Sequence, residues 1–110
     1  MITKNIVAIG GGGFGRSLGN LIIEKYIVSL SSQNNPKICF IPTASGDNDL
    51  YKLNFYRAFS QLKCIPSHID FFSRTENLES KILDQDIVYV GGGNTKSMLA
   101  VWKEWNLDNI

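Results

Sequence analysis

Short apolar runs alternate along the chain with longer stretches in which apolar residues recur at helical spacing. The short runs are rich in β-branched and aromatic residues, which favours strands at 5–9, 37–41, 67–72 and 86–90. The longer stretches repeat apolar residues every three or four positions, which predicts helices at 17–30, 50–62, 77–83 and 95–105. Asp47, Asn48 and Asp49 offer N-caps for the second of these helices.

Strands that alternate with helices in this order form a parallel sheet with helices packed on its faces. We therefore predict an α/β fold, a parallel sheet with helices on both faces in a three-layer arrangement of the Rossmann or flavodoxin-like type. A chain of 110 residues is long enough for one domain, and no linker or internal repeat divides it. Residues 1–110 are expected to form a single domain.

The composition narrows the class of protein. Apolar residues make up 44% of the chain and charged residues 19%, as in a folded domain. The net charge is +1 and no basic block is present, which argues against a nucleic-acid or membrane partner. The first residues lack a signal-peptide pattern, so a cytoplasmic protein is expected. Cys39 and Cys64 have no metal-ligand spacing, and no metal site is predicted.

Glycines and small polar residues follow the predicted strands, at the sheet edge where ligands bind in open α/β folds. The loop after the last strand is the barest, and its open backbone suits a close approach by another molecule. We take Gly91, Gly92, Gly93 and Asn94 as the main candidate site. The expected rim of the cleft is Gly11, Gly12, Thr43 and Ser45. The alternative is a tight turn in which Thr95 caps the next helix.

The glycine run at 10–13 also fits phosphate-binding patterns in letter. Gly10, Gly12 and Gly15 match G-x-G-x-x-G, and Arg16 replaces the lysine of a P-loop. No acidic residue ends the 37–41 run to hold a ribose, and neither that run nor 86–90 ends in an aspartate for Mg²⁺. A phosphate-binding or nucleotide-binding regulatory module is therefore an alternative function, beside a plain strand–helix turn.

The residues alone do not assemble a catalytic triad. A nucleophilic serine needs a base within hydrogen-bond reach, and His68 is the only histidine. The predicted strand 67–72 places His68 at the end opposite the cleft, so a structural role is expected. Ser17 and Ser45 consequently lack a base, and no G-x-S-x-G elbow is present.

Four stretches together resemble the peptidase E family of serine peptidases, family S51, which is similar in fold to class I glutamine amidotransferases. They are IVAIGGGGF, CFIPTAS, NFYRAF and VYVGGGNTKSMLAVW, and VGGGNT is the most specific. The resemblance implies hydrolysis of small peptides through an acyl-enzyme by a Ser-His-acid triad, without a cofactor or metal. In that family the serine follows the helix after GGGNT. The triad is thus expected beyond Ile110, and this chain is expected to be an N-terminal half.

The same resemblance gives the glycine loop a role. A main-chain N–H of Gly92 or Gly93 is expected to help form the oxyanion hole, with Asn94 shaping the turn. The chain is expected to be inactive alone, and its unfinished sheet to self-associate or to pair with a missing C-terminal half. A non-functional remnant is the remaining alternative.

Overall fold

The computed structural model describes residues 4–11, 13–14 and 19–110. Its sheet has three parallel strands in the order β2-β1-β3. They are β1 (Lys37–Ile41), β2 (Ile65–His68) and β3 (Ile87–Val90). The register places Ile38 beside Pro66 on one side and beside Ile87 on the other.

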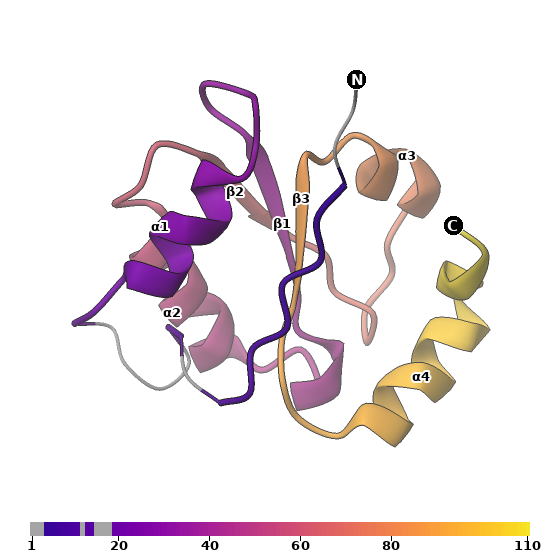
Figure 1. Cartoon of the computed structure of the whole chain (residues 1–110). Helices are drawn as coiled ribbons and strands as arrows, with labels where there is room; N and C mark the ends of the chain where they lie inside the picture. Colours follow the sequence, from indigo (N-terminus) through magenta and orange to yellow (C-terminus); the bar gives the residue numbers. More distant parts are fainter. Residues whose placement is uncertain (1–3, 12, 15–18) are drawn as a thin grey trace.

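Helices cover both faces of this sheet (Figure 1). The helices are α1 (Ile22–Ser29), α2 (Asp49–Phe59), α3 (Leu78–Leu83) and α4 (Thr95–Glu104), with 3-10 turns η1 (Thr43–Ser45) and η2 (Leu107–Asn109). In Figure 1, α1 and α2 lie on one side of the strands, and α3 and α4 lie on the other. The predicted open α/β fold with helices on both faces is confirmed.

Alternation along β1 divides the core into two halves. Ile38 and Phe40 pack against α1 and α2, in a cluster that includes Ile27, Phe55 and Phe59. The alternate residues, Cys39 and Ile41, turn to the other face, as the two-residue period of a strand requires. There Cys39 and Ile41 form a second cluster with residues that follow β2 and with Leu78 of α3, and Trp102 and Trp105 pack against it.

Aromatic rings fill the first cluster. Phe14 is almost fully buried, and its ring centroid lies 5.1–5.8 Å from those of five other aromatic residues, which are Phe40, Tyr51, Phe55, Phe59 and Tyr89. Phe40 and Phe55 stack with centroids 4.8 Å apart and ring planes at 12°. Phe14 comes from the glycine-rich N-terminal segment, so this cluster ties that segment to the sheet.

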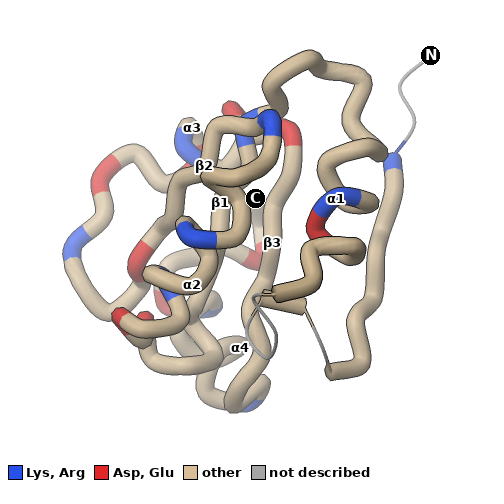
Figure 2. Tube along the Cα trace, turned by 90° about the vertical axis from the view of Figure 1, so that its left-hand side faces the viewer, with Lys and Arg blue, Asp and Glu red and all other residues tan. Residues whose placement is uncertain are grey.

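The predicted strand at 5–9 is not a strand in the structure. Figure 2 shows this segment standing apart from the sheet. Its side chains are largely exposed, and Ile6 is 98% exposed. The strand pattern of the sequence is genuine, but a strand needs a hydrogen-bonded neighbour, and the described structure provides none here.

The bounds of other strands and helices also differ from the predicted ones. The strand expected at 67–72 is β2 at Ile65–His68, and residues 69–72 form the loop after it. The helix expected at 17–30 begins at Ile22, and residues 17 and 18 lie outside the described residues. The helices α2, α3 and α4 lie where the apolar spacing predicted them. No helix in the described part of the chain is long and apolar enough to cross a membrane.

Truncation of the Phe55 side chain tests the aromatic cluster. Phe55→Ala should lower the free energy of unfolding by about 3–5 kcal/mol, because it removes a fully buried ring and leaves a cavity. Phe72 is 57% exposed, so the matched variant Phe72→Ala should stay within about 0.5 kcal/mol of the parent chain. Urea unfolding followed by circular dichroism measures both, and equal losses would contradict this account of the core.

The two thiols should differ in reactivity. Burial raises the pKa of the Cys39 thiol to about 11, and Cys39 is fully buried. Burial also raises the pKa of Cys64, which is only partly buried. Because the thiolate is the reactive form, a disulfide reagent at pH 8 should label Cys64 first and Cys39 only after unfolding. Rapid labelling of native Cys64→Ser would show that β1 is open to solvent.

Candidate functional site

The loop of residues 91–94 joins β3 to α4 and is held at both ends. Gly91 donates its N–H to the carbonyl oxygen of Ile41 at 3.1 Å, which continues the pairing of β3 with β1. Asn94 donates its N–H to the carbonyl oxygen of Ala44 at 2.7 Å. The side chain of Asn94 accepts a hydrogen bond from Ser97 N–H at 2.9 Å. Asn94 rather than Thr95 is therefore the N-cap of α4.

Two of the three glycines in this loop are required by the fold. A Cβ on Gly91 would lie 2.9 Å from the ring of Phe40 and 3.0 Å from that of Tyr51. Gly93 has φ +144°, and a Cβ there would lie 2.2 Å from the carbonyl oxygen of Ala44. Gly92 has nothing within 4 Å of such an atom. The packing of the described residues thus leaves Gly92 open.

The N–H groups of Gly92 and Gly93 differ in their partners. Gly92 donates to the hydroxyl oxygen of Tyr51 at 3.2 Å. No described residue accepts a hydrogen bond from Gly93 N–H, although its neighbour Asn94 is fixed by Ala44. The loop therefore fixes the N–H of Gly93 in place and leaves it without an acceptor among the described residues.

Two predicted rim residues have structural partners. Thr43 is buried, and its hydroxyl oxygen accepts a hydrogen bond from Trp102 Nε1 at 2.9 Å. Ser45 donates from its hydroxyl to the carbonyl oxygen of Pro42 at 2.9 Å. Both residues belong to η1, which packs against α4, and the Ala44 carbonyl oxygen of η1 accepts the N–H of Asn94. They position the site rather than line it.

The other rim residues lie in the glycine-rich segment. Gly11 lines an open groove of about 1830 Å³ that Gly92 and Gly93 also line. Residues 4–7 and 9, β3 and Tyr51 complete much of its wall. Gly12 lies outside the described residues. The structure thus brings Gly11, Gly92 and Gly93 to one groove, and Thr43 and Ser45 do not line it.

Glu24 is a buried structural anchor of the glycine-rich segment that the sequence analysis missed. It is fully buried, and its Oε2 accepts a hydrogen bond from Phe14 N–H at 3.1 Å. A Cβ on Gly13, which has φ +77°, would lie 3.1 Å from that oxygen. The N–H of Phe14 is therefore already bonded to a carboxyl group. The phosphate-binding alternative would instead need N–H groups of this segment as donors to the phosphate. The sequence signal for a buried Glu24 was its place one turn from Ile27, on the apolar side of a helix.

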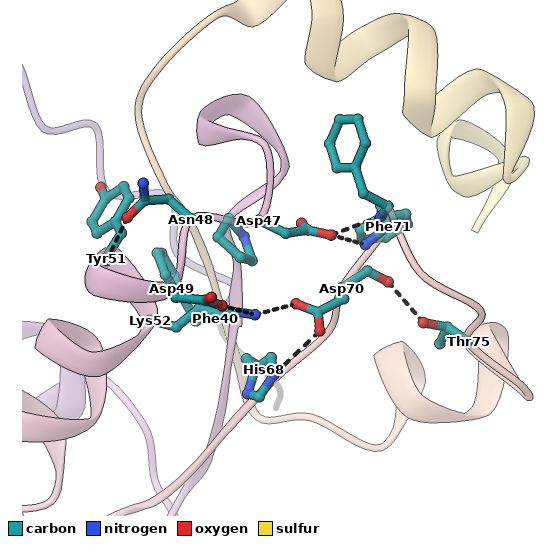
Figure 3. A network of polar contacts seen from close by, with 12 residues as sticks. Phe40, Asp47, Asn48, Asp49, Tyr51, Lys52, His68, Asp70, Phe71 and Thr75 are labelled. Atoms are coloured by element: carbon teal, nitrogen blue, oxygen red, sulfur yellow. Dashed lines mark hydrogen bonds and ion pairs between the residues drawn. The ribbon is translucent and has the colours of Figure 1, made fainter.

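A network of polar contacts joins the loops after β1 and β2 (Figure 3). Lys52 Nζ lies 3.0 Å from Asp70 and 3.2 Å from Asp49. Burial lowers the pKa of Lys52, but the hydrogen bonds to Asp70 and Asp49 outweigh it and leave the pKa above its usual value. Of the three candidate N-caps for α2, Asn48 caps the helix. Asp47 instead accepts the N–H groups of Phe71 and Phe72, both at 2.7 Å.

His68 lies at the carboxyl end of its strand, because β2 ends at His68. Its expected place at the opposite end was wrong. Its Nδ1 is 2.6 Å from the hydroxyl oxygen of Tyr56, and its Nε2 is 3.7 Å from Asp70. Neither partner is a serine.

Within the described residues, no group of three or more histidine, cysteine, aspartate or glutamate side chains could hold a metal ion.

A pair of alanine variants tests the geometry of the loop. Gly93→Ala should destabilise the chain by more than about 1 kcal/mol, because its φ is unfavourable for alanine and the new Cβ meets the Ala44 carbonyl group. Gly92→Ala should change the free energy of unfolding by less than about 0.5 kcal/mol, since its Cβ enters open space. Equal effects in a denaturant titration would show that the loop adopts another conformation.

Most of the chain matches a known protein family. The family model for peptidase family S51 matches residues 6–110. A curated relative, the protein named uncharacterized peptidase YgaJ of Bacillus subtilis strain 168, is 48% identical over 108 residues. That match covers 97% of this chain and 47% of the relative, so the chain spans about half the length of the relative. No significant match to a solved structure was found.

The family match includes the whole of the loop described above, together with β1, η1 and the Tyr51 side chain that contacts it. On this evidence the chain belongs to peptidase family S51.

Proposed function

We propose that this chain supplies the oxyanion loop of a serine peptidase, which hydrolyses small peptides through an acyl-enzyme. The observation that carries the proposal is the N–H of Gly93, which lies in a fixed loop on the groove and has no acceptor among the described residues. The family and the name of the relative support a peptidase reaction. The serine mechanism and the small-peptide substrate rest on the resemblance to peptidase E.

The loop has the physical property that an oxyanion donor needs. A donor stabilises a developing negative charge most effectively when it is already oriented, because no reorganisation is then needed in the transition state. Here Gly91 and Asn94 are each fixed by a backbone hydrogen bond, and Gly92 is held by Tyr51. Gly93 N–H is consequently the better candidate of the two expected donors.

The lack of a side chain at Gly92 also suits an oxyanion donor. A substrate carbonyl oxygen must come within about 2.7–3.1 Å of the donor nitrogen. Gly92 has no side chain to obstruct that approach, and no atom lies within 4 Å of the position that a Cβ would occupy there. This explains a glycine that the packing of the chain itself does not require.

The nucleophile and its base are proposed to come from a segment other than residues 1–110. The single histidine of the chain contacts Tyr56 and Asp70, which leaves no serine activated by it in the described structure. The purified chain should therefore show no hydrolysis of dipeptides, including those with an N-terminal aspartate.

The direct test is a chimera that joins this chain to the part of YgaJ outside the match. The folded chimera should hydrolyse members of a dipeptide panel, and a serine-directed fluorophosphonate should stop it. A folded chimera that has no activity, or activity that survives the reagent, would overturn the proposal.

Tyr51 is a positioning residue in this account, and its hydroxyl can be removed without removing the ring. In the chimera, Tyr51→Phe should lower kcat with little change in KM, by less than the 10²–10³ typical for loss of a donor itself. The matched change Tyr26→Phe alters an exposed tyrosine of α1 and should leave both constants unchanged. An unchanged kcat in Tyr51→Phe would show that the loop needs no such support.

A further inference from the structure

We propose that the groove beside β3 binds an extended apolar strand that residues 1–110 do not supply, from the remainder of a family S51 protein. The inference concerns assembly and does not depend on hydrolysis. In the described structure β3 pairs with β1 alone, so its other edge carries backbone N–H and C=O groups without strand partners. Such an edge is a template for a further strand.

Both faces of the sheet are apolar at this edge. Ile87 and Tyr89 pack against the aromatic cluster on one face. Val88 and Val90 point to the other face and are 42% and 44% exposed. An edge strand that faced water would carry charges there, as natural edge strands do. The apolar pair instead indicates a strand in the interior of a sheet, and its missing neighbour should be apolar on both faces.

The opposite wall of the groove also lacks a partner. Residues 4–7 and 9 line the groove across from β3, and they have the sequence pattern of a strand without forming one. Ile6 and Val7 are exposed, although both are β-branched. A strand placed between this segment and β3 could pair with both. The failed prediction at 5–9 and the open edge of β3 then have one cause.

The remainder of a family S51 protein is the occupant that the comparison favours. The relative is 48% identical to this chain, and the match leaves more than half of the relative uncovered. A chain of that length has further segments with which to cover β3, and this chain has no described segment in that place. A second copy of this chain would have to offer its own β3 edge, which would leave both 5–9 segments unpaired.

Co-expression tests the inference. The chain, carrying an affinity tag, is produced together with the part of YgaJ outside the match. Size-exclusion chromatography with light scattering should show a one-to-one complex. Hydrogen exchange should slow at residues 5–9 and along β3 when the complex forms. Failure of the YgaJ segment to co-purify, or a homodimer of the tagged chain, would overturn the proposal.

A matched pair of variants locates the binding surface. Val88→Lys places a charge on β3 inside the groove and should weaken the complex at least about tenfold. Leu99→Lys changes a similarly exposed apolar residue of α4 that does not line the groove, and it should leave the affinity unchanged. Circular dichroism confirms that both variants fold. Equal affinities of the two variants for the YgaJ segment would place the interface elsewhere. A complex that forms but does not hydrolyse peptides would contradict only the proposed function.

Discussion

The pairing of β1 on both of its edges is the constraint on which the rest of the structure depends. Four of its five residues are buried, because β2 and β3 flank it and helices cover its two faces. The strand leads directly into η1, whose Ala44 carbonyl group fixes Asn94. The same strand fixes Gly91 through Ile41. A buried strand thus determines the place of the candidate oxyanion loop from both ends.

Much of this could be predicted from local patterns. The periodicity of apolar residues located α2, α3, α4, β1 and β3, since each buries a face that the sequence marks. The run Gly91–Asn94 was recognised because a strand, bare glycines and an N-cap residue follow one another in order. The choice of Gly93 over Gly92 as the proposed donor needed the structure, because the close approach of Ala44 comes from a residue far away in the sequence.

The failures have physical reasons of their own. The strand predicted at 5–9 was wrong, because the pattern expresses only a local preference and strand formation depends on a neighbour that a local pattern cannot show. His68 was misplaced because the strand was predicted at 67–72, whereas β2 begins at Ile65, includes Pro66 beside Ile38, and ends at His68. Glu24 and Asp47 were missed as anchors because their partners, Phe14 N–H and the N–H groups after β2, lie 10 to 25 residues away.

The central claim is that Gly93 N–H faces the charge that develops in the reaction. A crystal structure of the chimera, or of the complex, with a peptide boronate bound to the nucleophile tests it most directly. The account predicts a boronate oxygen about 2.7–3.1 Å from Gly93 N, with Gly92 N–H still on Tyr51. A boronate oxygen that is bound elsewhere, with Gly93 N–H facing solvent, would contradict it.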